Sequence, residues 1–138
     1  MNRNKTEQIR LLCKSVGSAK QTMAVARKDI EILQQKLSMA TTERMKGMIE
    51  NAIRRRENEI KRAEDIVSSF MNAVNGLDFE ARNLMIQLYI KQKRWSEIVS
   101  LDGKQMNARE VNTVYKRALR HMVMNAERIG ILTGNEGM

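Results

Sequence analysis

The sequence predicts an all-α protein with a long N-terminal antiparallel helical hairpin, coiled-coil-like, over residues 1–76. A three-helix unit is expected over residues 77–124 and a C-terminal tail over residues 125–138. The chain has no proline and only 7 glycines in 138 residues, so little in it interrupts helices. Apolar residues in the first half recur at alternating spacings of three and four, the period of packed helices. In the second half, Asn-Gly and Asp-Gly pairs mark turns between shorter helical segments.

The first predicted helix extends from Lys5 to Ser38. Its apolar positions form a heptad seam of the kind found in left-handed coiled coils. The seam consists of Ile9, Leu12, Val16, Ala19, Met23, Ala26, Ile30, Leu33 and Leu37. At ~1.5 Å per residue such a helix is about 50 Å long.

The pattern stops around Met39 and resumes after Thr41 or Thr42, either of which can cap a second helix. The second seam reaches the turn at Asn75-Gly76. Its members are Ile49, Ile53, Arg56, Ile60, Ala63, Val67, Phe70, Val74 and Leu77. Arg56 is the one charged member, and we expect its long side chain to extend to solvent near the looser end of the hairpin.

Two helices of similar length with a short connection are expected to fold back antiparallel. Further apolar residues lie beside the seams, among them Ile32, Met48 and Ile66. A two-helix hairpin cannot cover these residues by itself. We therefore expect a homo-oligomer, with a dimer favoured.

After Asn75-Gly76, Asp78 is expected to cap a helix from Phe79 to about Lys91. A basic connector then leads into a short helix that begins near Arg94 to Ser96 and ends at Leu101. In this helix Trp95 is expected to anchor the packing between helices.

Asp102-Gly103 closes the short helix, since glycine readily adopts the left-handed conformation of a sharp turn. Asn107 and Glu110 then have the spacing of a capping box at the start of a last helix. A short helix, a turn with glycine and a second helix with exposed polar residues is the helix-turn-helix arrangement.

The charge of the chain favours an anionic partner. The formal net charge is +9 and the pI is about 10.1, which favours nucleic acid first and a membrane surface second. From Lys91 to Arg120 there are 8 basic and 3 acidic residues, a local balance of +5. The expected partner is double-stranded DNA.

In a helix-turn-helix, the first residues of the second helix meet base edges. Arg109 is suited to guanine and Asn112 to adenine, while Thr113, Lys116 and Arg120 are placed to hold phosphates. The candidate DNA-binding residues are Lys93, Arg94, Lys104, Arg109, Asn112, Thr113, Lys116, Arg117 and Arg120.

The segment from Asp78 to Met122 resembles the fourth conserved region of bacterial sigma factors. The resemblance rests on Trp-x-Glu-Ile at Trp95–Ile98 and on Arg-Ala-Leu at Arg117–Leu119. It is closer still to phage-encoded regulators of the ArpU and RinA type, in which a helical N-terminal part precedes such a unit. The resemblance implies sequence-specific binding to promoter DNA and activation of late or packaging genes, with RNA polymerase as a candidate partner. The turn at Asp102–Lys104 is longer than in the usual pattern, so individual base contacts are expected to differ.

Two other functions fit the same pattern. A phage small terminase subunit also joins helix-turn-helix-like and coiled-coil parts, and it would bind DNA as a packaging ring. A helical adaptor would use the hairpin to hold a protein partner without contacting DNA.

Several classes of protein are not indicated. Cys13 is the only cysteine, so an internal disulfide and a multi-cysteine zinc site are excluded. His121 is the only histidine, and no glycine-rich phosphate loop is present. We expect no enzymatic activity, no cofactor and no metal. The chain shows no signal-peptide core and no run near the ~18 apolar residues of a membrane span, so a cytoplasmic location is expected. The resemblance to phage-encoded regulators implies that this is the cytoplasm of a bacterial host.

Overall fold

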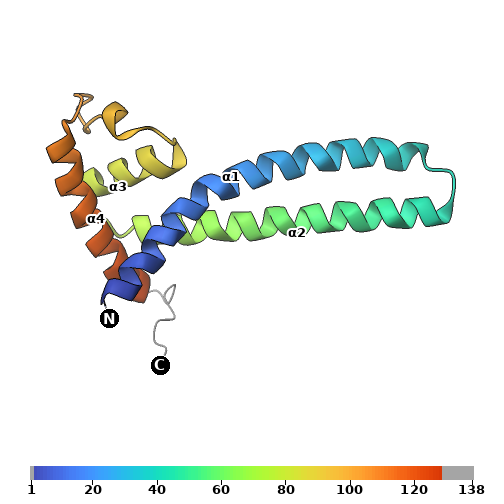
Figure 1. Ribbon diagram of the computed structural model, residues 1–138, viewed down its shortest axis with the longest axis horizontal. Coiled ribbons are helices and arrows are strands. Elements are labelled where there is room, and N and C mark those ends of the chain that lie inside the picture. The colour runs from blue at the N-terminus through green and yellow to red at the C-terminus, as the bar shows by residue number, and fades with distance from the viewer. Residues whose placement is uncertain (1, 129–138) are drawn as a thin grey trace. The chain divides into compact units, whose positions relative to one another are not determined.

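A computed structural model describes residues 2–128, with side chains from residue 5 onward (Figure 1). Its elements are α1 (Asn2–Met39), α2 (Glu43–Val74), α3 (Phe79–Met85), the π-helical η1 (Ile86–Ile90), the 3-10 turn η2 (Trp95–Glu97) and α4 (Ala108–Arg128). The structure is 83% helical, and the long helices α1 and α2 pack against each other. The predicted all-α class and N-terminal hairpin are therefore confirmed.

The corner of the hairpin lies between Met39 and Glu43. Thr42 Oγ1 accepts a hydrogen bond from the Met45 N–H at 3.1 Å. This bond satisfies one of the free N–H groups at the start of α2, so of the two expected threonine caps Thr42 is the one used.

The chain divides into two compact units, and their boundary differs from the predicted one at residue 76. The arm comprises residues 18–67, and the core unit combines residues 2–17 with residues 68–128. The difference has a packing reason. The first turns of α1 and the last turns of α2 carry side chains that are fully buried in the core unit. These are Ile9, Cys13 and Val16 of α1 and Phe70 and Val74 of α2.

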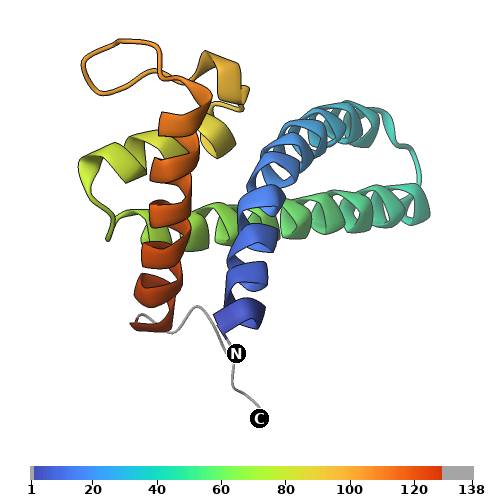
Figure 2. The ribbon, with the colours of Figure 1, turned by 60° about the vertical axis from the view of Figure 1, so that its left-hand side comes forward.

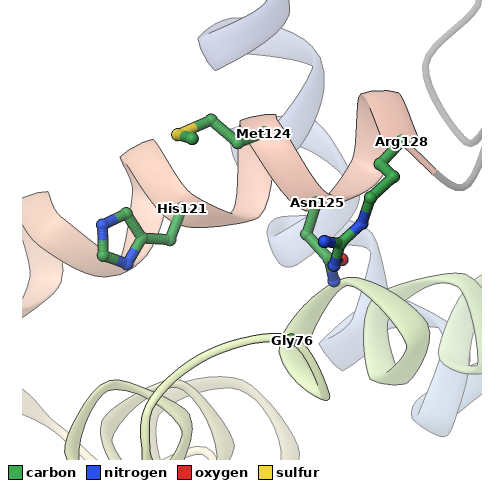
Figure 3. A pocket seen from close by; sticks show the side chains of 5 residues that line it. All are labelled: Gly76, His121, Met124, Asn125 and Arg128. Carbon is green, nitrogen blue, oxygen red and sulfur yellow. The ribbon is translucent and has the colours of Figure 1, made fainter.

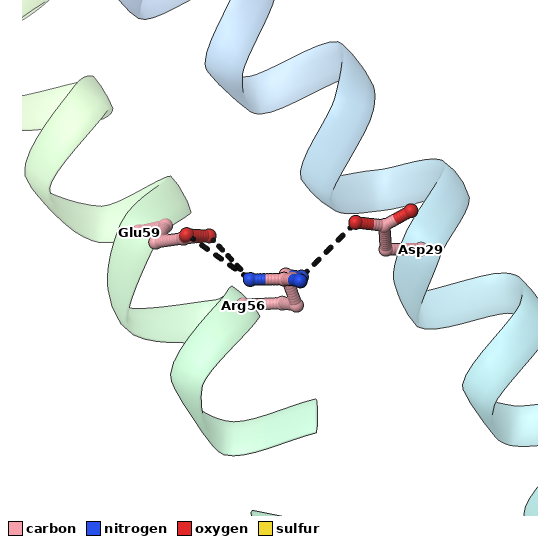
Figure 4. A network of polar contacts seen from close by, with 3 residues as sticks. All are labelled: Asp29, Arg56 and Glu59. Carbon is pink, nitrogen blue, oxygen red and sulfur yellow. Dashed lines mark hydrogen bonds and ion pairs between the residues drawn. The ribbon is translucent and has the colours of Figure 1, made fainter. Parts of the chain in front are cut away.

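Within the arm, Arg56 is held in place rather than extended freely to solvent (Figure 4). Its Nε lies 3.0 Å from Asp29 Oδ2 on α1, an ion pair that is not aligned as a hydrogen bond. Its Nη1 donates to Glu59 Oε1 at 3.1 Å along α2. Arg56 thus links the two helices of the arm. The expectation that its side chain extends to solvent is wrong.

The core unit is built around α3 and α4. Leu84 and Met85 of α3 and Val111, Ala118 and Met122 of α4 are almost completely buried. Cys13, which lies at a flank of the heptad seam, is also buried in this core. Burial raises the pKa of its thiol from 9.0 to about 12.

Helix α4 continues through Arg128, into the segment predicted as a tail from residue 125. The tail prediction is wrong for residues 125–128, because Asn125 anchors this last turn of the helix. Its Nδ2 donates to the carbonyl oxygens of Asn72 at 3.0 Å and Ala73 at 2.7 Å, which satisfies the end of α2. Figure 3 shows the Asn125 side chain directed at the turn around Gly76. The remainder of the predicted tail, residues 129–138, lies outside the described residues.

The start of α1 lies beside the end of α4 in both ribbon views (Figures 1 and 2). Lys5 pairs there with Glu127. The first turns of the predicted hairpin therefore help to hold α4.

The prediction of a short helix that begins near Arg94 to Ser96 and ends at Leu101 is wrong beyond the first turn. Only Trp95–Glu97 is helical, as a 3-10 turn, and the chain then becomes extended. Val99 forms an isolated antiparallel bridge with Gln105, and Met106 N–H donates to Ile98 O at 3.1 Å. We call residues 98–106 the tongue. Gly103 turns its tip with a φ of +84°, the left-handed conformation that was predicted.

Candidate nucleic-acid interface

The start of α4 is fixed by the predicted capping box. Asn107 Oδ1 accepts from the Glu110 N–H at 2.9 Å, and Glu110 Oε1 accepts from the Asn107 N–H at 3.0 Å. These reciprocal bonds satisfy two N–H groups at the helix start. The side chains of the first turns of α4 therefore project from a defined position.

One side of α4 is buried and the opposite side carries exposed polar side chains. The exposed set, which we call the basic face, consists of Arg109, Asn112, Thr113, Lys116 and Arg120. At 100° per residue these five positions cover about 100° of the helix circumference. The structure thus brings together five of the nine predicted DNA-binding residues.

The charges of the basic face are not neutralised within the part of the chain that the structure describes. Among residues 5–128, no acidic side chain forms an ion pair with Arg109, Lys116 or Arg120. Thr113 is partly engaged, since its hydroxyl donates to the Arg109 carbonyl oxygen at 2.9 Å. The face therefore has free positive charge and polar groups available for an anionic ligand.

Arg117 lies at the side of this face and is engaged with α3. Its Nη2 donates to Glu80 Oε1 at 2.6 Å, and its Nε lies 3.3 Å from Asp78 Oδ2. The hydrogen bond with Glu80 raises the pKa of the guanidinium further. Asp78 also caps α3 as predicted, accepting from the Ala81 N–H at 2.7 Å. Arg117 therefore braces α4 against the start of α3.

Aromatic side chains support the opposite side of α4. The ring of Tyr115 lies 5.2 Å from that of Trp95, centroid to centroid, and its hydroxyl oxygen is 3.0 Å from that of Tyr89. Tyr89 in turn meets Phe70 edge-on at 6.0 Å. Trp95 thus contacts Tyr115, but 42% of its surface remains exposed, so it packs less completely than expected of an anchor between helices.

The tongue is attached to the core unit through Gln87, which is only 2% exposed. Its Nε2 donates to the Val99 carbonyl oxygen at 2.8 Å, and its Oε1 accepts from the Val99 N–H at 3.1 Å. Asn83 Nδ2 also donates to the Val99 carbonyl oxygen, at 3.2 Å. A buried side-chain amide thus pairs with the tongue as a neighbouring strand would.

The three other predicted DNA-binding residues are placed differently from one another. Lys93 is half-buried and donates to Gln87 Oε1 at 3.3 Å, so its ammonium faces the tongue anchor. Arg94 is exposed beside the 3-10 turn. Lys104 is exposed near the tip of the tongue, next to Asp102, whose pKa is lowered by hydrogen bonds from the Ser100 hydroxyl and the Lys104 N–H. Arg94 and Lys104 remain available to a ligand, whereas Lys93 is occupied.

A groove between the tongue and α4 is mainly acidic, in contrast to the basic face. It is lined by Glu80, Asp102 and Glu110 together with neutral residues and Lys104. Three carboxylates repel a phosphate backbone. The side of α4 that faces this groove is therefore less suited to an anionic ligand than the basic face is.

Together, the fold and this face define a small all-α protein with an exposed cationic helix. Comparison with models of protein families, with curated proteins and with solved structures finds no match. Within residues 2–128 no helix combines the length and apolarity that crossing a bilayer requires. The same residues contain no group of three or more His, Cys, Asp or Glu side chains placed to hold a metal ion.

Proposed function

We propose that this protein is a sequence-specific DNA-binding transcriptional regulator, of the phage or prophage late-gene kind that the sequence resembles. The supporting observation is the basic face, where three cationic side chains that pair with no acidic side chain among residues 5–128 accompany Asn112 at the capped start of an exposed helix. The major groove is about 12 Å wide and accepts an α-helix. The first 13 residues of α4 form a rod about 20 Å long, which suits insertion at its N-terminal half.

Each residue of the face has a role that follows from its chemistry. Arg109, in the first turn, forms paired hydrogen bonds with a guanine, and Asn112 forms them with an adenine. Lys116 and Arg120, about two and three turns after Arg109, contact phosphates and set the register on the duplex. Lys104 and Arg94 add backbone contacts from the tongue and the 3-10 turn.

The support of this helix differs from the one in a standard helix-turn-helix. A single 3-10 turn and the tongue replace the expected supporting helix. The ion pairs of Arg117 with Asp78 and Glu80 brace α4 in its place. The proposal therefore rests on α4 and its exposed residues rather than on the angle between two helices.

Fluorescence anisotropy with the DNA upstream of the encoding operon tests the proposal, with a scrambled duplex as the nonspecific reference. Arg109→Ala and Asn112→Ala each remove one base contact, worth about 1–3 kcal/mol, so specific binding should weaken about 5- to 150-fold. Nonspecific binding should change much less. Arg27→Ala is the matched control, since Arg27 is an exposed basic residue on the helix of the arm.

The two other functions give different results in the same assay. A helical adaptor would show no salt-sensitive binding to any duplex, even at low ionic strength. A packaging protein would bind both duplexes alike as a ring of eight or more subunits. Equal binding by wild type, Arg109→Ala and Asn112→Ala would refute the assignment of α4 as the helix that contacts bases.

A further inference from the structure

The arm contains almost no buried side chain of substantial size. Its residues with less than a tenth of their surface exposed are alanines, namely Ala19, Ala26 and Ala63. The larger seam residues, such as Ile30, Leu33 and Ile53, are only half-buried. Units of this size are stable only when they bury a sufficient apolar core. The arm by itself leaves much of its apolar surface in contact with water.

The exposed apolar residues of the arm gather on one face. A groove between α1 and α2 is lined by Val25 and Asp29 from one helix and by Arg56 and Glu59 from the other. Ile32 and Met39 follow Val25 at intervals of seven, so they continue the α1 edge of this groove. Their exposed fractions are 49% for Val25, 51% for Ile32 and 72% for Met39.

Helix α2 supplies the other edge of the same groove. Met45 and Ala52 precede Glu59 by fourteen and seven residues, so they lie on its side of the helix. Met48, eleven residues before Glu59, points in nearly the same direction. We call this surface the arm face, with Val25, Ile32, Met39, Met45, Met48 and Ala52 as its apolar residues and the Asp29–Arg56–Glu59 cluster in its groove (Figure 4).

The heptad spacing indicates that the partner covering this face is helical. A stripe that repeats every seven residues stays in register with another helix crossing at about 20°. The footprint is about 33 Å long, from 22 residues of α1, and about 20 Å wide for two helices, or about 660 Å². Stable interfaces bury roughly 600–1,000 Å² per partner, so a second hairpin of the same size would form an interface at the lower end of this range.

The face is complementary to itself under one particular two-fold rotation. The Asp29–Arg56 pair shows which residues of α1 and α2 lie level along the arm. A two-fold axis parallel to the helices places α2 of a second copy over α1 at the same level. Met39 then meets Met45 and Met48 of the second copy, Ile32 meets Ala52, and Asp29 meets the exposed Arg55.

The other face-to-face arrangement matches less well. A two-fold axis across the helices that sets Ile32 against Ile32 and Ala52 against Ala52 places Met45 over Glu59. The lengthwise axis also sets Val25 level with Glu59, but it places both Met45 and Met48 against Met39 and sets an acid against a base. The mixed charges of the groove also avoid the repulsion that a face of one sign would have for its own copy.

We propose that the arm face binds the arm face of a second copy of this chain, forming a four-helix bundle whose two-fold axis is parallel to the helices. The proposal rests on the arm alone and does not depend on DNA binding. The Asp29–Arg56–Glu59 cluster becomes enclosed in the bundle, where a polar group fixes the register of packed helices.

The first test is the oligomeric state of the full chain by analytical ultracentrifugation. Wild type should be a dimer at micromolar concentration, and Met48→Glu should shift the dissociation constant upward by at least 100-fold. Met124→Glu is the matched control, because Met124 of α4 is 62% exposed and Met48 is 65% exposed. A monomeric wild type, or a dimer that resists Met48→Glu, would overturn the proposal.

The second test fixes the axis by disulfide formation between two single variants, Ile32→Cys and Ala52→Cys. The lengthwise axis predicts linked dimers in an equimolar mixture and little linkage in either variant alone. Linkage of Ile32→Cys with itself would overturn the lengthwise axis, and absence of linkage in the mixture would do the same. The native Cys13 thiol is fully buried and does not compete.

Discussion

Replacing Gln87 with leucine tests whether the tongue is held by a buried side-chain amide. Gln87→Leu removes the bond from Nε2 to the Val99 carbonyl oxygen and the bond from the Val99 N–H to Oε1. Asn83 still donates to that carbonyl oxygen, so the Val99 N–H is left without a partner, and the half-buried Lys93 ammonium also loses its bond to Oε1. Leucine is similar in size, so the effect isolates hydrogen bonding from packing.

The expected magnitude follows from these bonds. Each lost hydrogen bond is worth about 1 kcal/mol, and an unsatisfied N–H adds about 1–3 kcal/mol when it is buried. Val99 is half-buried and leucine gains apolar burial, so the net loss should be about 2–3 kcal/mol. This loss corresponds to roughly 30- to 150-fold less protection of the amides that the tongue bonds secure.

Amide hydrogen exchange measured at Val99 and Met106 is the direct assay. Both N–H groups are bonded in the folded tongue, to Gln87 Oε1 and to the Ile98 carbonyl oxygen. Gln35→Leu, at an exposed position of α1, serves as the control. If Gln87→Leu left the protection of both amides unchanged, the hydrogen bonds of Gln87 with Val99 would not be what holds the tongue.

Further substitutions and a thiol probe test the role of Arg117, the packing at Gly76 and the burial of Cys13. Arg117→Ala should lower stability to urea by about 1 kcal/mol, while Arg120→Ala should leave stability unchanged and weaken DNA binding; the reverse result would return Arg117 to the DNA-binding set. Gly76→Ala should lower stability by about 2–3 kcal/mol, since a Cβ would lie 2.5 Å from the Asn125 side chain and displace it. Cys13 should react with a thiol reagent at pH 8 only as fast as the protein unfolds, because its side chain is fully buried and burial raises its pKa to about 12. Its raised pKa also means that stability is lost as the pH rises from 9.0 towards about 12; a Cys13→Ala variant should lack this contribution.

The features that the sequence predicted correctly depend on neighbouring residues. Thr42, Asp78 and Asn107 each cap a helix through an N–H three residues away, so the residue types and the spacing suffice. The hairpin follows from a heptad repeat sustained along two helices. Gly103 follows from the backbone conformation that a sharp turn requires.

The tongue was not predictable in this way, since its anchor is remote in sequence. Trp95 to Leu101 has the apolar spacing of a helix, and the local pattern does not distinguish that helix from a turn followed by a strand. The deciding contact comes from Gln87, twelve residues before Val99. A glutamine on the buried side of an otherwise apolar helix was the available signal, because a buried amide requires partners.

Arg117 illustrates the same limit for the candidate site. Its position on α4 placed it among exposed basic residues, but α3 supplies Asp78 and Glu80 beside it. The boundary between the units also depended on tertiary packing, since Ile9 and Phe70 fit the heptad seam as well as any residue of the arm. Heptad patterns identify which side of a helix is buried, but not which partner buries it.

The proposed DNA binding and the proposed dimer can be tested together through the salt dependence of DNA binding. Each protomer offers four cations to phosphates, namely Lys116, Arg120, Lys104 and Arg94, so a dimer that engages both protomers neutralises about eight phosphates, with a slope of log K against log salt near −7.2. A monomer neutralises about four phosphates, with a slope near −3.6. Met48→Glu should therefore halve the slope although Met48 contacts no DNA, whereas Met124→Glu should leave the slope closer to that of wild type. A Met48→Glu monomer that retained the full slope would show that one face accounts for all of the binding, and dimer formation by the arm would then serve another purpose.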